Sequence, residues 1–102
     1  MAGTGSPRHF LSLADLAPAE LGGLLDDAAR LKATPVPPEA PLAGRTLAMI
    51  FEKPSLRTRL SFDVGTLQLG GRAIYLSPAE VGLGRRESVA DVARVVSRMT
   101  DF

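Results

Sequence analysis

Apolar positions recur along the chain at helical spacing in three blocks. The first block covers about 13–32, the second 56–69 and the third 88–99. Residues three and four apart lie on one side of an α-helix, so this spacing places an apolar stripe along each block and leaves charged side chains on the other side. We therefore predict three helices over these ranges.

The ends and inner faces of these helices can also be predicted. Pro18 suits a first helical turn, where its missing N–H would have no partner, and Ser88 is a favourable N-cap for the last helix. Gly70-Gly71 is expected to end the second helix. The apolar stripe of the second helix is Leu60, Val64 and Leu67, and the residues predicted to face inward in the third are Val89, Val92, Ala93 and Val96.

Two short apolar runs between the helices predict β-strands. Residues 46–51 form a nearly continuous apolar run, typical of a buried strand covered on both faces, and residues 73–76 form another. The proline-rich stretch 33–44 is expected to be an extended connector. Alternating helices and strands indicate an α/β fold with a parallel sheet flanked by helices. Two strands do not complete such a sheet, so we expect an incomplete three-layer domain.

Composition and charge narrow the class of protein. The chain has 102 residues, of which 45% are hydrophobic and 23% charged, with a formal net charge of +1. That balance argues against a protein that coats a polyanion. The absence of cysteine and the single histidine, His9, exclude disulfides, thiolate metal sites and histidine clusters. The sequence has no membrane-length apolar stretch and no start typical of a signal peptide, so we expect a cytoplasmic protein.

Positive charge is concentrated between the first predicted strand and the second predicted helix. The segment reads Lys53-Pro54-Ser55-Leu56-Arg57-Thr58-Arg59, and ligands of parallel α/β folds bind where strands end. With Ser55 as N-cap, the next three backbone N–H groups would be free to bind an anion. Arg57 adds a planar guanidinium that matches phosphate oxygens. The alternative is an ordinary helix start with solvated arginines; the segment is not a Walker loop, because it lacks Gly-Lys-Ser/Thr.

Several motifs, in order, resemble those of the aspartate and ornithine carbamoyltransferases. The first is Ser-x-Arg-Thr-Arg at 55–59, continued by Leu-Ser-Phe-Asp at 60–63. The likeness extends through Gln-Leu-Gly-Gly at 68–71, through 83–88 and 91–98, and upstream to 10–16. Phe-Glu-Lys before Ser55 and Leu-Gly-Arg in the later loop are more similar to the ornithine branch than to the aspartate branch.

This resemblance implies a carbamoyl-phosphate site at the start of the second helix. Ser55, Leu56, Arg57 and Thr58 would hold the phosphate, and Leu56 would do so through its main-chain N–H. Arg57 and Thr58 would also act in catalysis: Thr58 would touch the carbonyl oxygen of carbamoyl phosphate, and Arg57 would neutralise the leaving phosphate.

The resemblance implies weaker contributions from three further positions. Arg59 would mainly support the loop, by pairing with an acid such as Glu87. Gly82 stands where ornithine enzymes often have glutamine, and with Arg86 it belongs to a loop that would enter the site of a neighbouring subunit of a trimer. A solvated loop is the alternative for Arg85 and Arg86.

The implied reaction transfers the carbamoyl group to the δ-amine of ornithine, giving citrulline and phosphate in arginine biosynthesis, without cofactor or metal. Family members are much longer than this chain. We therefore expect residues 1–102 to be a partial carbamoyl-phosphate-binding domain that lacks the amino-acid-binding domain and does not turn over ornithine by itself.

Three alternatives stay open at this stage. The acceptor could be aspartate, putrescine or acetylornithine, because no residue in this segment would contact the amine. The chain could also be a non-catalytic phosphate-binding or trimer-forming module. Nucleic-acid binding by the arginines at 57, 59, 85 and 86 is disfavoured by the near-neutral charge and the few aromatic residues.

Overall fold

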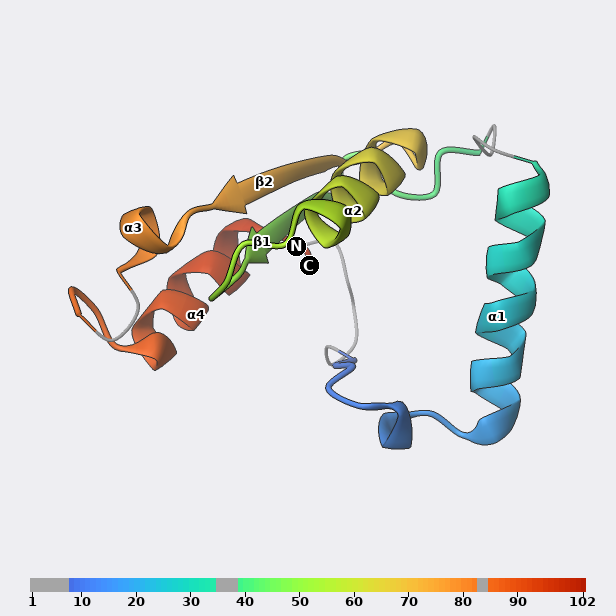
Figure 1. The fold of residues 1–102 in the computed structure, drawn as a ribbon, viewed down its shortest axis with the longest axis horizontal. Helices are drawn as coiled ribbons and strands as arrows, with labels where there is room; N and C mark the ends of the chain where they lie inside the picture. Colours follow the sequence, from blue (N-terminus) through green and yellow to red (C-terminus); the bar gives the residue numbers. More distant parts are fainter. Residues whose placement is uncertain (1–7, 35–38, 83–84) are drawn as a thin grey trace. The chain divides into compact units, whose positions relative to one another are not determined.

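The structure is a computed structural model that describes residues 8–34, 39–82 and 85–102. The chain divides into two compact units, residues 2–37 and residues 38–102, and each is described by itself. Figure 1 labels the elements along the chain. Within the described ranges, no helix has both the length and the apolar character needed to cross a membrane.

The first unit contains a 3₁₀ turn, η1 (Leu13–Asp15), and a helix, α1 (Pro18–Ala33). The prediction of a helix over 13–32 is confirmed from Pro18 onward and is wrong before it. The Asp15 carboxylate accepts hydrogen bonds from the N–H groups of Leu11 and Ser12, at 2.6 and 3.1 Å. These bonds, the one from Leu11 foremost, close η1 as a separate turn and lower the pKa of the Asp15 carboxyl. Pro18 then starts a new helix in the position that suits it.

The leucines of α1 are largely open to solvent in this structure. Leu24, Leu25 and Leu31 are exposed, and Leu21 is half-buried. The start of the helix is held by Glu20, whose carboxylate accepts a hydrogen bond from Arg8 at 2.5 Å and another from the Ala17 N–H at 3.2 Å. Both bonds lower the pKa of Glu20, the one from Arg8 more strongly.

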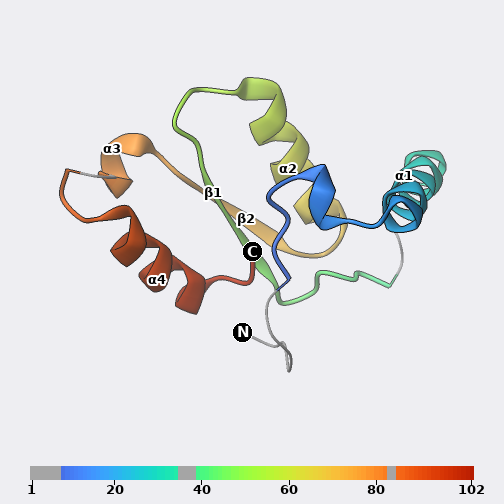
Figure 2. The ribbon, with the colours of Figure 1, turned by 90° about the horizontal axis from the view of Figure 1, so that it is seen from below.

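The second unit has the element order β1 (Thr46–Ile50), α2 (Leu56–Gln68), β2 (Arg72–Leu76), α3 (Pro78–Val81) and α4 (Val89–Met99). The two strands are parallel, in a register that pairs Thr46 with Arg72 and Ile50 with Leu76. Figure 2 shows α2 on one side of the strands and α4 on the other. This arrangement confirms the predicted α/β fold with a parallel sheet flanked by helices. The short helix α3, capped by the Ser77 hydroxyl, was not predicted.

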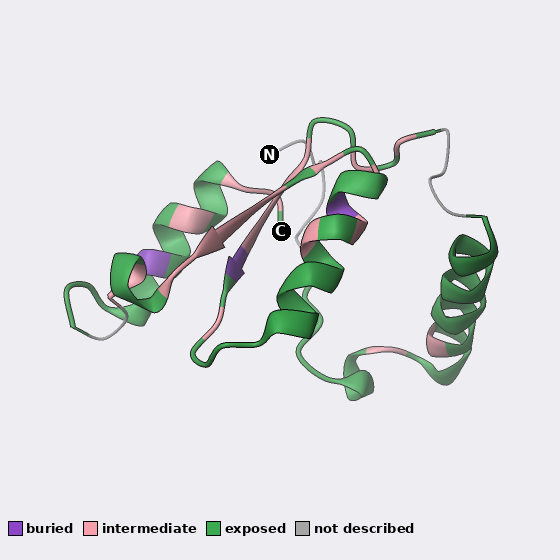
Figure 3. Cartoon of the chain, turned by 45° about the horizontal axis from the view of Figure 1, so that its top comes forward, coloured by how far each residue is buried: buried purple, intermediate pink, exposed green. Residues whose placement is uncertain are grey.

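The core of this unit is small, as the colours of Figure 3 show. Met49 of β1 is 4% exposed and Val92 of α4 is 6% exposed. The prediction that β1 is covered on both faces is wrong, because its other residues are half-buried and Ile50 is exposed. A sheet of two strands is too narrow to bury every residue of β1 together with the whole apolar face of a helix.

The predicted inner faces of the helices are only partly confirmed. In α4, Val92 is buried and Val96 is half-buried, but Val89 and Ala93 are exposed. In α2 the stripe of Leu60, Val64 and Leu67 is exposed, and the one buried residue of the helix is Thr66. Its hydroxyl donates to the carbonyl of Phe62 at 2.5 Å, so burial leaves no polar atom unpaired.

A glycine pair ends α2, as the sequence predicts. The N–H of Gly70 donates to Leu67 at 3.0 Å and the N–H of Gly71 donates to Thr66 at 2.9 Å, the two bonds of a Schellman motif. Gly70 has a φ of 94°, and a Cβ there would lie 2.7 Å from the Cβ of Ala40. Only glycine therefore fits this turn without movement of the connector that precedes β1.

The far edge of β1 is also paired, which the sequence did not reveal. The Phe102 N–H donates to Thr46 at 3.2 Å, and the Ala48 N–H donates to Phe102 at 2.9 Å. These two bonds flank Leu47 in the pattern of a parallel ladder. Asp101 adds a bond from the Thr46 N–H to its carboxylate at 2.9 Å and an ion pair with Arg45 at 3.5 Å. β1 thus lies between β2 and the chain at 101–102.

We predict that Asp101→Asn lowers the free energy of unfolding near neutral pH and reduces its dependence on pH. The Thr46 N–H and, to a lesser degree, Arg45 lower the pKa of the folded Asp101 carboxyl below its usual 3.8. As pH falls, the Asp101 carboxylate of the unfolded chain is therefore protonated before that of the folded chain. The stabilisation that the charged carboxylate provides is complete above the unfolded pKa and is lost as pH falls through the folded pKa. Urea unfolding between about pH 7 and about pH 2 should show the two proteins converging at acid pH. An equal gap between them at all pH values would contradict this role for the charge.

Candidate anion-binding site

The predicted anion site lies at the end of β1 and the start of α2. Ser55 is the N-cap residue, and the first helical bond joins the Arg59 N–H to the Ser55 carbonyl at 3.0 Å. The N–H groups of the three residues before Arg59 therefore have no partner within the helix. Every residue from Ser55 to Arg59 is exposed. These donors, at the positive end of the helix dipole, are open to an anion.

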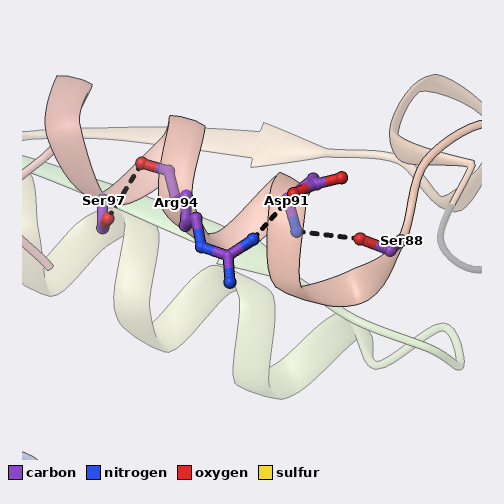
Figure 4. A network of polar contacts seen from close by, with 4 residues as sticks. All are labelled: Ser88, Asp91, Arg94 and Ser97. Atoms are coloured by element: carbon purple, nitrogen blue, oxygen red, sulfur yellow. Dashed lines mark hydrogen bonds and ion pairs between the residues drawn. The ribbon is translucent and has the colours of Figure 1, made fainter.

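Ser55 occupies the predicted N-cap position, but its hydroxyl does not cap the helix. Its backbone has φ −149° and ψ 87°, and its side chain makes no capping hydrogen bond. By contrast, the Ser88 hydroxyl accepts the Asp91 N–H at 3.1 Å at the start of α4, as Figure 4 shows. The hydroxyl of Ser55 is thus a further polar group at this helix start that remains available to a ligand.

Arg59 does not make the predicted ion pair with Glu87. The ion pairs between described residues do not include it, and the Arg59 guanidinium lies over the ring of Tyr75, 3.9 Å from its centroid. Tyr75 in turn meets Phe51 edge to face, with ring centroids 5.8 Å apart. A guanidinium over a tyrosine ring contributes about 0.5–2 kcal/mol, depending on how far it is desolvated.

A cavity of about 610 Å³ opens at the carboxyl ends of both strands. Its walls come from the end of β1 and the residues after it, from α3 and the loop that follows, and from the first residue of α4: Ile50, Phe51, Glu52, Pro78, Ala79, Gly82, Arg85 and Val89. Arg85 therefore lines this cavity, whereas the sequence left a solvated loop as an open alternative for it. Nothing in the spacing of the arginines distinguishes Arg85 from Arg86.

Gly82 and Arg86, the two weaker candidates, lie against each other. Gly82 has the left-handed φ of 57°, and its carbonyl accepts the N–H groups of Arg85 and Arg86 at 2.9 and 3.0 Å. A Cβ on Gly82 would stand 3.0 Å from the Arg86 Cγ, so the aliphatic part of Arg86 covers this glycine. The predicted contact of either residue with a ligand of another subunit stays a prediction.

The topology of the sheet singles out the end of β1 as a place for a ligand. From β1 the chain passes through α2 to β2 at one edge, and through α4 it returns to the opposite edge of β1 at Phe102. The chain therefore pairs first with one edge of β1 and then with the other, so its direction across the sheet reverses at β1. In open α/β sheets, ligands bind outside the carboxyl ends of the strands at such a reversal.

Residues 8–102 match the family described as aspartate/ornithine carbamoyltransferase, carbamoyl-P binding domain, and the chain belongs to this family. Among its relatives, the ornithine carbamoyltransferase of Rhodopseudomonas palustris is 54% identical over 105 residues, which cover 100% of this chain and 34% of the relative. That of Agrobacterium fabrum is 56% identical over 98 residues, covering 94% of this chain and 32% of the relative. The chain thus spans about a third of the length of these relatives.

Solved structures agree with this assignment. The anabolic ornithine carbamoyltransferase of Campylobacter jejuni superposes with a TM-score of 0.86 at 44% identity, over 94% of this chain and 31% of that one. An N-acetyl-L-ornithine transcarbamylase, solved in complex with carbamyl phosphate and N-succinyl-L-norvaline, gives a TM-score of 0.81 at 40% identity, over 93% of this chain and 32% of that one.

We predict that Ser55→Ala and Ser88→Ala differ sharply in their effect on stability. Ser88→Ala removes a capping bond and should lower the free energy of unfolding by about 1 kcal/mol. Ser55→Ala removes an exposed hydroxyl without a capping partner, so its effect should stay within about 0.5 kcal/mol. Urea unfolding of the two variants and the unchanged protein measures this. A loss at Ser55 as large as that at Ser88 would show that its hydroxyl caps α2 in solution.

Proposed function

We propose that this chain forms the carbamoyl-phosphate-binding part of an ornithine carbamoyltransferase. The observation that supports this most directly is the exposed start of α2. Free N–H groups follow a parallel strand there, the Ser55 hydroxyl makes no capping bond, and Arg57 is the second residue of the helix. The high identity to ornithine carbamoyltransferases supports the choice of substrate. Such an arrangement suits a small dianion with a planar carbamoyl group attached.

The phosphate would be held by the Ser55 hydroxyl, the N–H groups of Leu56, Arg57 and Thr58, and the Arg57 guanidinium. A hydrogen bond to a charged group contributes about 1.5–3 kcal/mol. Four or five of them, less the cost of association, correspond to binding in the micromolar range. The main chain before Arg59 is fixed by the first bonds of α2, so these donors are already oriented before the ligand arrives.

The chemistry would be attack of the ornithine δ-amine on the carbonyl carbon of carbamoyl phosphate. A C–N bond forms, the C–O bond to phosphate breaks, and the amine loses a proton, giving citrulline and phosphate. Thr58 would donate to the carbonyl oxygen as negative charge develops there, and Arg57 would neutralise the leaving phosphate. Holding both reactants in one place supplies a large part of the acceleration.

The remaining parts of the proposal concern the whole protein. Residues 1–102 would be a partial domain, and the groups that bind the amino acid would lie outside it. Gly82 and Arg86 would face a neighbouring subunit in a homotrimer, and the reaction would serve arginine biosynthesis in the cytoplasm. The similarity to the anabolic ornithine carbamoyltransferase of Campylobacter jejuni supports that direction of metabolism.

A second candidate is an N-acetylornithine transcarbamylase. The likeness to such an enzyme at a TM-score of 0.81 and 40% identity favours it over an aspartate enzyme or a non-catalytic module. The phosphate site would be the same and only the acceptor amine would differ. Assays of the protein as its gene encodes it, with ornithine, N-acetylornithine, putrescine and aspartate in parallel, decide between these acceptors.

We predict that Arg57→Ala raises the Kd for carbamoyl phosphate about tenfold to a hundredfold, the loss of a bidentate charged contact. Calorimetric titration with carbamoyl phosphate and with inorganic phosphate measures this. Arg98→Ala, at an exposed position of α4, is the matched control and should leave both Kd values unchanged. An unchanged Kd in Arg57→Ala would mean that the phosphate is not held at α2.

Leu56 offers a test of the main-chain contact alone. Leu56 is the first residue of α2, a position where proline is well tolerated. We predict that Leu56→Pro, which removes one N–H, raises the Kd for phosphate about tenfold, whereas Leu56→Ala, which keeps it, changes the Kd less than about twofold. Equal affinities in the two variants would argue that this N–H does not bind the ligand.

A further inference from the structure

Tyr75 lies outside the motif that suggests the phosphate site, yet its ring contacts both sides of the loop that forms the site. The Arg59 guanidinium covers the ring at 3.9 Å, and Phe51 meets it edge to face at 5.8 Å and 78°. Phe51 directly follows β1, and Arg59 lies in the first turn of α2. One aromatic ring therefore contacts a residue on each side of the loop from Glu52 to Ser55.

The ring stands on a firm base. Tyr75 is the residue before the last in β2 and is paired in register with Met49, the most buried residue among the core side chains. Side chains of paired residues point to the same face of a sheet. Tyr75 and Met49 thus share the face that carries α2, and the sheet fixes the position of the ring.

The N-terminal half of α2 has little else to hold it. Leu56 is 68% exposed and Leu60 52% exposed. The contacts that fix the helix lie at its other end, in buried Thr66 and the turn at Gly70 and Gly71. Without the contact between Arg59 and Tyr75, the first turn would be the loose end of a helix anchored only at its C-terminus.

We propose that Tyr75 is a positioning residue for the phosphate site, acting through Arg59 on the first turn of α2. The ring holds the turn that carries the free N–H groups against β2, and Phe51 packs edge to face against the same ring. This inference rests on the proposed function, because the ligand whose donors are positioned is the phosphate of carbamoyl phosphate.

A tyrosine ring suits this task better than a carboxylate would. A carboxylate would hold Arg59 but would also cancel its positive charge. The face of an aromatic ring attracts the guanidinium through its quadrupole and leaves the net charge in place. Arg59 is thereby held still and continues to add to the positive potential at the helix start, where the anion binds.

The test compares Tyr75→Phe with Tyr75→Leu in the protein as its gene encodes it. Phenylalanine keeps the aromatic face and should leave the Kd for inorganic phosphate within about twofold. Leucine removes the face and should raise that Kd about fivefold or more, with the loss persisting in high salt because donor geometry rather than long-range charge is altered. Calorimetric titration at two salt concentrations measures both.

Arg59→Met removes the same contact from an exposed position and covers the case in which Tyr75→Leu does not fold. The Kd in Arg59→Met should rise at least as far as in Tyr75→Leu, and in the double variant it should rise no further than in Arg59→Met alone. A normal Kd in folded Tyr75→Leu, or equal losses in Tyr75→Phe and Tyr75→Leu, overturns the proposal. If Arg57→Ala also binds phosphate normally, the proposed function fails; if Arg57→Ala binds poorly, only the role of Tyr75 fails.

Discussion

Parallel pairing of β1 is the constraint on which the rest of the second unit depends. A parallel strand cannot be reached by a tight hairpin, so the chain must leave the end of β1 and cross the sheet before β2 begins. The crossing is α2, and its first turn therefore lies beside the carboxyl end of the strand. The exposed N–H groups of that turn follow from the topology, and Ser55 and Arg57 are added to a place that the fold already makes suitable for an anion.

The longer helices and both strands could be predicted because each has a strong local signal. The helices α2 and α4, the cap at Ser88 and the glycines after α2 depend on neighbours in sequence and were confirmed, whereas η1 and α3 are single turns that leave no helical repeat to recognise. The burial of the helix faces could not be predicted in the same way, because it depends on how much sheet is available to cover them. The exposed stripe at Leu60, Val64 and Leu67 is the clearest case.

The candidate site was predicted in position but not in detail. The order of charges and the strand before Ser55 were enough to predict an exposed helix start there, which the structure has; that an anion binds to it stays a prediction. Three details depend on contacts between segments far apart in sequence or on a single backbone angle. They are the Ser55 hydroxyl that makes no capping bond, the place of Arg85 at the cavity and the ring of Tyr75 under Arg59. No spacing rule carries that information. The same holds for the pairing of Phe102 with β1, which joins residues more than fifty positions apart.

Recognition by main-chain groups has a consequence for how such a site changes over time. At Leu56 the proposed contact belongs to the backbone, so any residue that keeps the N–H and starts a helix serves equally well. The side chain at this position can therefore change without loss of the contact, whereas the backbone conformation at Ser55 and the position of Arg59 have to be kept. Selection would then act on the backbone conformation of the helix start more than on the identity of each residue in it. A binding site can therefore persist after part of its sequence motif has been replaced.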